Sequence, residues 1–165
     1  MGFNPFVDRW KNPNTGEAYD VNEILRTQFW DSYSTGQFAV VTPTVVEKVR
    51  SQSGCTDLEG ALWENQGDVD SFPHWETRTF YGESMTAASK YELTSYSELT
   101  FALLVDTGWY QVDWSYAQPL SFGHKAGCDF HRTKCITYAD DDTSQENPIT
   151  SSDVFCTSDQ AMSGG

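Results

Sequence analysis

Apolar residues follow a helical spacing in the stretch after residue 42. Three valines lie on one face of the helix that this spacing predicts. Thr42 is a suitable N-cap, and Pro43 stands at the first helical position, where its missing amide hydrogen costs nothing. Gly54 follows the last turn, where glycine commonly ends a helix. These features predict a helix over residues 43–53.

A second apolar run, residues 99–105, is hydrophobic on almost every side. A helix of this kind is expected to be buried within its domain. Ser95 and Glu98 have the spacing of a capping box, and Gly108 stands where such a helix should end. The pattern therefore predicts a buried helix over residues 96–107.

The other apolar runs are short and predict strands and turns. Residues 38–41 form a brief apolar run and residues 109–114 alternate, so both are expected to be strands. Residues 10–17 are rich in turn formers and predict a hairpin-like reversal. Periodicity does not decide between helix and strand for residues 21–30. Residues 55–67 are expected to be irregular, with Leu58, Leu62 and Trp63 packed inward.

This mixture of helices and short strands predicts an α+β fold. The chain has 165 residues, and six Trp, eight Tyr and ten Phe supply a strongly aromatic core. We expect one domain over residues 1–135. Residues 136–165 turn polar and are expected to be the truncated start of a cysteine-containing C-terminal region.

Charge and hydropathy exclude several classes of partner. The formal net charge is −14 at pH 7, which repels nucleic-acid phosphates and anionic lipid. The sequence has no apolar run of about 18 residues, so we expect no direct membrane insertion by this segment. The N-terminal residues also lack the basic and apolar regions of a signal peptide.

Four cysteines bear on the compartment of the protein. Cys55, Cys128, Cys135 and Cys156 lack the C-x-x-C spacing of a zinc ribbon. Their even number, beside abundant Tyr, Ser and Thr, fits disulfides in an oxidising compartment. Composition leaves one alternative open, namely four buried thiols in a cytosolic protein.

The candidate chemistry lies in residues 71–86. His74 stands among aromatic residues, and Met85 follows eleven positions later, after a turn that contains glycine. By itself, a histidine beside Trp75 is more often a packed, hydrogen-bonded side chain than a metal ligand. A methionine in a turn is more often a filler of the core.

Several motifs, in a fixed order, resemble leishmanolysin-like peptidases, which are zinc metalloproteases of the metzincin class. The run over residues 101–130, which includes Asp106-Thr107-Gly108-Trp109-Tyr110 and Ala126-Gly127-Cys128-Asp129-Phe130, resembles the segment after the family's Met turn. His74-Trp75-Glu76 and Glu83-Ser84-Met85-Thr86 resemble the third zinc ligand and the Met turn itself. Gly54-Cys55-Thr56-Asp57-Leu58-Glu59 resembles a helix end and its cysteine. The resemblance covers residues 42–135 well and the two ends weakly.

The resemblance implies an incomplete metzincin-type catalytic domain with an irregular, disulfide-linked tail. It would comprise an insertion region, the third-ligand stretch, the Met turn and the buried C-terminal helix. His74 would be a Zn²⁺ ligand and Met85 the apolar floor beneath the metal. Gly2, within Met1-Gly2-Phe3, would be the glycine that turns the chain off the active-site helix. Glu76 and Glu83 are candidates for fixing the His74 tautomer; the alternative is that both are surface carboxylates.

The family also implies pairings for the cysteines. It pairs Cys55 with Cys128 in a disulfide. Cys135 and Cys156 either pair with each other or have partners further along the chain. His124 and His131 have no ligand spacing, and we expect both to be exposed loop residues.

One departure from the family limits the expected activity. The family's zinc helix carries H-E-x-x-H, which supplies two histidine ligands and the glutamate general base. The only histidines here are His74, His124 and His131, and none stands in that pattern. We therefore expect a fragment of a zinc metalloendopeptidase that is inactive by itself, whose partners are protein or peptide substrates and the missing N-terminal part of its own catalytic domain. By this resemblance it would lie at the cell surface or outside the cell. The alternatives are a non-catalytic extracellular or cell-adhesion module and an unrelated acidic cytosolic domain.

Overall fold

The computed structural model describes six segments of the chain, residues 9–28, 36–64, 74–87, 94–132, 155–156 and 163–164. The chain divides into two compact units, Met1–Thr133 and Lys134–Gly165. In the second unit, strand β4 (Phe155–Cys156) pairs antiparallel with strand β5 (Ser163–Gly164). Gly2 and Cys135 lie outside the described residues, as does the Cys156 side chain, so the predictions for them stay predictions.

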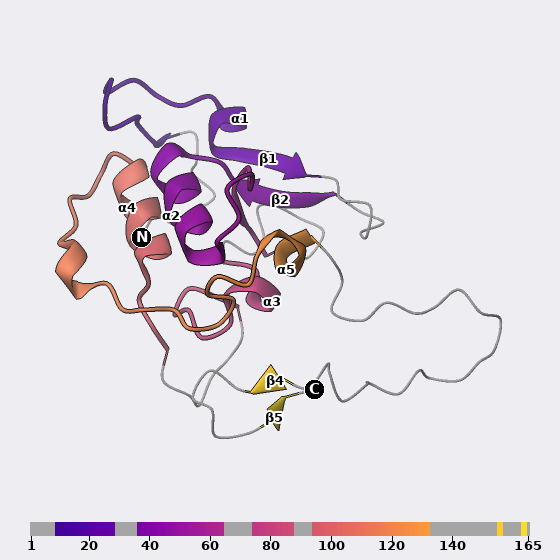
Figure 1. Ribbon diagram of the computed structural model, residues 1–165. Coiled ribbons are helices and arrows are strands. Elements are labelled where there is room, and N and C mark those ends of the chain that lie inside the picture. Colours follow the sequence, from indigo (N-terminus) through magenta and orange to yellow (C-terminus); the bar gives the residue numbers. More distant parts are fainter. Residues whose placement is uncertain are drawn as a thin grey trace. The chain divides into compact units, whose positions relative to one another are not determined.

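A small antiparallel sheet is built from three short strands of the first unit (Figure 1). They are β1 (Leu25–Gln28), β2 (Gln37–Val40) and β3 (Ala61–Leu62), in that order. Leu25 pairs with Val40, and Val40 pairs in turn with Ala61. The predicted strand over residues 38–41 is thereby confirmed. Residues 55–67 were expected to be irregular, but β3 lies within them because it completes the sheet beside β2.

The undecided segment 21–30 contains both kinds of element. Helix α1 (Val21–Ile24) begins after Asp20, which forms a capping box with Glu23, and β1 follows without a break. The expected reversal over residues 10–17 is also present: Lys11 pairs with Ala18 across a turn.

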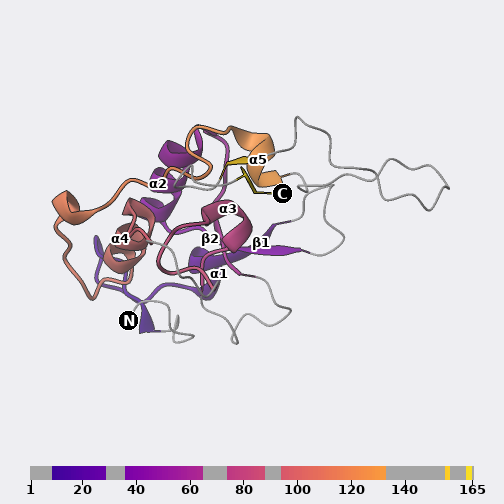
Figure 2. The ribbon, with the colours of Figure 1, turned by 90° about the horizontal axis from the view of Figure 1, so that it is seen from below.

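Two longer helices pack against each other beside the sheet (Figures 1 and 2). Helix α2 (Pro43–Ser53) has the predicted bounds and ends at Gly54 with the left-handed φ of 73°. Thr42 precedes it but makes no side-chain cap; instead the buried carboxylate of Asp106 accepts the backbone amides of Thr44 (2.9 Å) and Val45 (3.0 Å). A side chain from the end of the second helix thus stabilises the start of the first.

Helix α4 (Glu98–Asp106) is the second long helix, and it begins later than predicted. Its N-cap is Ser97, whose hydroxyl accepts the Leu99 amide, and Ser95 caps nothing. The reason is that Ser95 pairs through its backbone with residues 82–84. The helix is also less buried than expected: one face is in the core, while Phe101 and two neighbouring apolar residues are partly exposed.

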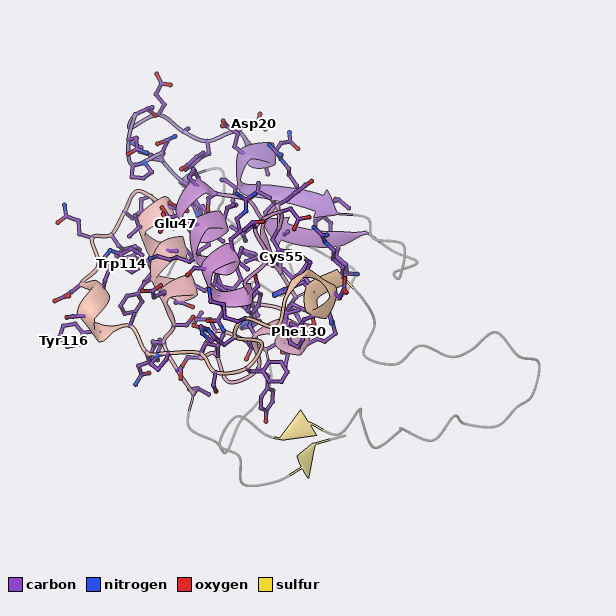
Figure 3. The ribbon with its side chains drawn as sticks, viewed as in Figure 1. Asp20, Glu47, Cys55, Trp114, Tyr116 and Phe130 are labelled. Atoms are coloured by element: carbon purple, nitrogen blue, oxygen red, sulfur yellow. A yellow bond between two sulfur atoms is a disulfide. The ribbon has the colours of Figure 1, made fainter. Side chains whose placement is uncertain are left out.

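The segment after α4 corrects another prediction. Residues 109–113 form no strand, and a single-turn 3-10 helix (Trp114–Tyr116) follows them. Alternation predicts a strand only where a neighbouring strand supplies backbone partners, and this stretch has none of those pairings. Tyr116 is 74% exposed, and with Trp114 it lies at the outer edge of this unit (Figure 3).

Two short helices complete the described part of the first unit. Helix α3 (Thr77–Phe80) follows the His74 stretch, and helix α5 (Cys128–Arg132) begins at a disulfide. The sulfur atoms of Cys55 and Cys128 are bonded, with 4.9 Å between the Cα atoms, so the pairing implied by the resemblance is confirmed. Among the helices of the described residues, none combines the length and apolarity that a membrane span needs.

The core is aromatic, as expected from composition. Its largest fully buried side chains include Trp10, Trp63, Trp75 and Phe80. Trp75 makes edge-to-face contacts with both Trp63 and Phe80, at ring centroid separations of 6.4 and 6.0 Å. Trp75, at the centre of this cluster, directly follows His74, so the cluster fixes the backbone from which the candidate ligand projects.

Candidate metal-ligand strand and Met turn

His74 belongs to a short segment, residues 74–76, which we call the ligand strand because Trp75 forms bridges with Trp63 and with Thr86. On one side, the Glu64 amide donates to the His74 carbonyl oxygen (2.8 Å). On the other side, the Trp75 amide donates to the Met85 carbonyl oxygen (3.0 Å), and Trp75 forms a parallel bridge with Thr86. Backbone hydrogen bonds therefore hold the candidate ligand and the methionine turn side by side.

The His74 ring has one nitrogen without a partner among the described residues. The residue is only partly buried, yet its Nδ1 atom is shielded from solvent and makes no hydrogen bond. Buried polar atoms are usually hydrogen-bonded, so this unpartnered nitrogen is an exception that a ligand could account for. An imidazole of this kind fits one ligand position of a zinc site, and it provides one ligand only.

The described residues bring no second histidine to His74 in a metal-binding group. The one cluster of ligand-type side chains among them is Cys55, Asp57 and Cys128. Its two sulfur atoms form the disulfide, which removes the thiolates that a metal would need. A complete three-histidine site therefore needs two ligands that these 165 residues do not hold in H-E-x-x-H spacing.

The methionine turn covers Glu83 to Thr86. Its chain reversal begins at Gly82, whose φ of 89° favours glycine. The Glu83 amide donates to the Phe80 carbonyl oxygen, and the Thr86 hydroxyl donates to the Glu83 carbonyl oxygen (2.9 Å). The Met85 side chain is partly buried and packs against the core. The turn is thus a tightly hydrogen-bonded unit joined to the ligand strand.

Glu83 is buried, so the alternative that it is a surface carboxylate was wrong for this residue. Its side chain is 0% exposed, and one oxygen, Oε2, accepts the Met85 amide. The other oxygen, Oε1, accepts hydrogen bonds from the amide and hydroxyl of Ser97 and from the hydroxyl of Thr100. Burial raises the pKa of Glu83, and these hydrogen bonds act against that shift. The sequence signal for its partners was the Ser97-x-x-Thr100 spacing, which the apparent capping box at Ser95 concealed.

Glu76 has a different local role. Its backbone amide donates to the Leu62 carbonyl oxygen, and its side chain accepts the Arg78 amide as the N-cap of α3. It therefore ends the ligand strand and starts the next helix. The prediction that Glu76 also fixes the tautomer of His74 stays a prediction.

The other two histidines differ from each other. His124 is exposed, as expected, but His131 is 2% exposed, so that expectation was wrong for His131. His131 lies in helix α5, where its ring packs against Phe130 of the same helix and Phe80 of α3. The Arg78 guanidinium donates to the backbone carbonyl oxygens of Phe130 and His131. Burial, together with the charges of Arg78 and Arg132, lowers the pKa of His131 to about 4.

A groove of about 700 Å³ opens elsewhere, between α2, the start of α4 and residues 117–124. Its lining includes Lys48, Gln52, Gln118 and His124, and includes neither His74 nor Met85. It is therefore separate from the ligand strand and the Met turn.

Comparison with known proteins agrees with the motifs. The family model described as leishmanolysin matches residues 20–163. A leishmanolysin-like peptidase of Caenorhabditis elegans is 40% identical over 127 residues, which cover 72% of this chain and 18% of the relative. The ciliated left-right organizer metallopeptidase of Mus musculus is 34% identical over 152 residues, covering 90% of this chain and 20% of the relative. Leishmanolysin of Leishmania donovani is 40% identical over 94 residues, which cover 56% of this chain and 16% of the relative.

The matched region, residues 20–163, contains His74, Met85 and both disulfide cysteines. The chain spans about a fifth of the length of these curated relatives. The family model and the relatives agree, and this chain belongs to the leishmanolysin family of metallopeptidases.

Proposed function

We propose that this chain supplies the third zinc ligand and the Met turn of a zinc-dependent metalloendopeptidase that cleaves protein or peptide substrates. His74 is the ligand and Met85 the apolar floor. The observation that carries the proposal is the shielded, unpartnered Nδ1 atom of His74 on a strand bonded to the Met85 turn. Gly2 would turn the chain off the zinc helix, as the family motif implies.

Zinc, when bound, would polarise the scissile carbonyl and acidify a water molecule. The work of this chain's residues is to hold one imidazole in place: the strand hydrogen bonds fix its backbone, and the buried Trp75 anchors the next residue. The general base and two ligands are not among these residues in the family's pattern. We therefore propose that the chain alone is inactive and that a segment carrying H-E-x-x-H completes the site.

We place the complete protein at the cell surface or outside the cell. The Cys55–Cys128 disulfide supports an oxidising compartment, because such bonds rarely persist in the cytosol. It also counts against the interpretation as an acidic cytosolic domain with free thiols.

A fusion experiment tests the proposed function. The chain is expressed alone and also behind the H-E-x-x-H segment of a leishmanolysin-like relative, and bound zinc and peptide hydrolysis are measured. We expect zinc and activity only in the fusion, and His74→Ala to weaken zinc binding beyond the roughly 10–100-fold typical of losing an outer partner. His124→Ala is the control and should change neither property. Unchanged zinc binding after His74→Ala would exclude His74 as a ligand.

A second candidate is a non-catalytic extracellular or adhesion module that keeps the peptidase scaffold. The observation in its favour is a set of exposed aromatic side chains, namely Tyr96, Trp109, Tyr110, Trp114 and Tyr116. Exposed aromatic residues are common at protein interfaces. A folded fusion that binds no zinc would favour this candidate over the peptidase.

A further inference from the structure

We propose that Glu83 is a positioning residue that holds the Met turn and the His74 strand in a fixed relation to helix α4. The proposal rests on the proposed function, because the site it positions is the one that contains His74 and Met85. It goes beyond that function by assigning a role to a buried carboxylate that does not act on zinc or substrate.

The first step is the connection from Glu83 to the Met turn. The two side-chain oxygens of Glu83 face different structures: Oε2 accepts the Met85 amide at 2.5 Å, whereas Oε1 faces the start of α4. There it accepts the amide of Ser97 at 3.2 Å and its hydroxyl at 3.1 Å. A single carboxylate therefore joins the turn to the N-terminus of the helix.

The second step is the connection from Glu83 to the ligand strand. The Trp75 indole Nε1–H donates to the Thr100 hydroxyl oxygen at 3.0 Å, and that hydroxyl donates to Oε1 of Glu83 at 2.5 Å. Trp75 is fully buried and directly follows His74. Its amide also donates to the Met85 carbonyl oxygen, so a closed ring of contacts links the strand, the turn and the helix.

The third step is the need for a carboxylate. Both side-chain oxygens of Glu83 act as acceptors here, whereas a glutamine amide has only one acceptor oxygen. In Glu83→Gln, either the Met85 amide or the α4 donors would therefore face an NH₂ group. A buried donor left without an acceptor costs stability beyond the lost hydrogen bond, because its interaction with water is not replaced. The substitution should thus loosen the turn relative to the helix.

A nuclear magnetic resonance experiment on the full chain tests this role. Amide hydrogen exchange is measured at Trp75 and Met85, and the imidazole ¹⁵N signals are recorded for His74, all without zinc. Asp106→Asn is the matched control, because Asp106 is also buried and also accepts two backbone amides, but those amides belong to α2. Global unfolding is measured in parallel, so that site-specific changes can be separated from overall destabilisation.

We expect Glu83→Gln to speed exchange at Trp75 and Met85 by roughly 10- to 100-fold beyond the global change, which is the range for a lost charged hydrogen bond. The His74 ring signals should shift as well. In Asp106→Asn the single amide oxygen can still accept both Thr44 and Val45, because both amides bond to the same oxygen, Oδ2, of Asp106. Exchange at Trp75 and Met85 should therefore not rise beyond the global change in this control. Equal exchange at Trp75 and Met85 in both variants, or unchanged His74 signals in Glu83→Gln, would overturn the proposal.

Thr100→Val keeps the test decisive if Glu83→Gln does not fold. This nearly isosteric change removes the hydroxyl between Trp75 and Glu83. We expect faster exchange of the Trp75 indole hydrogen and shifted His74 ring signals, and unchanged His74 signals would overturn the proposal. Because these measurements need no zinc, a failed zinc test in the fusion would count against the proposed function and leave the linkage through Glu83 to be judged separately.

Discussion

The amide of Trp75 donates a hydrogen bond to the carbonyl oxygen of Met85, with 3.0 Å between nitrogen and oxygen. One residue before this bond stands His74, whose Nδ1 atom is shielded and unpartnered within the described part of the chain. A candidate ligand and the methionine turn are thus adjacent through the backbone itself. Such a link keeps their spacing independent of side-chain rotation.

Replacing His74 should affect the stability of the chain far less than replacing its neighbour Trp75. His74→Ala removes a partly buried ring without a hydrogen bond at Nδ1, so we expect a loss below about 1 kcal/mol. Trp75→Ala empties the centre of the aromatic cluster and should cost about 3–5 kcal/mol. Denaturant unfolding measures both. Equal losses would mean that the His74 ring belongs to the core.

The disulfide should contribute much of the stability of the first unit. Cys55 and Cys128 are separated by 73 positions, and closing a loop of that size stabilises by about 4 kcal/mol in the chain-entropy model. Chemical denaturation with and without a reductant measures the loss. The variant Cys55→Ser/Cys128→Ser should lose a similar amount of stability without any reductant. A midpoint that is insensitive to reduction would contradict this contribution.

Acid should destabilise the fold through His131. Its pKa is about 4 in the folded chain and 6.5 when unperturbed, so between these values the unfolded state binds a proton that the folded state does not. The free energy of unfolding therefore falls as pH drops from 6.5 to 4, by at most about 3 kcal/mol, and this contribution changes no further below pH 4.

The histidine variants isolate this effect in unfolding measurements at several pH values. His131→Leu should flatten the dependence between pH 4 and 6.5, because it removes the titrating ring. The control His124→Gln should retain the full dependence, because His124 is exposed. An unchanged pH dependence in His131→Leu would assign the acid sensitivity to other groups.

Gly108 should tolerate alanine less well than Gly16, although both have a left-handed φ, of 72° and 76°. A Cβ atom on Gly108 would lie 2.2 Å from the Lys11 carbonyl oxygen, whereas a Cβ on Gly16 meets nothing within 4 Å. Gly16→Ala should cost about 1–2 kcal/mol from φ alone. Gly108→Ala should cost more, because the Lys11 backbone must also move. Thermal unfolding compares them, and equal losses would show that the contact relaxes freely.

Local sequence determined much of the fold. The bounds of α2, the left-handed glycine after it and the strand β2 follow from spacing and capping chemistry that act within a few residues. The order of the motifs also identified the family, the candidate ligand His74 and the Cys55–Cys128 pairing, which the comparisons and the disulfide bear out at the level of family and pairing.

Only the tertiary structure decided which polar residues are buried and what they hold. Glu83 and His131 both looked like surface residues, yet the packing of α4 and α5 encloses them. Ser95 had the spacing of a cap but pairs with the Met turn, so Ser97 caps α4 instead. The physical reason is that each outcome depends on partners between 11 and 53 positions away in the chain, such as Ser84 for Ser95 and Arg78 for His131. Local spacing carries no information about such partners.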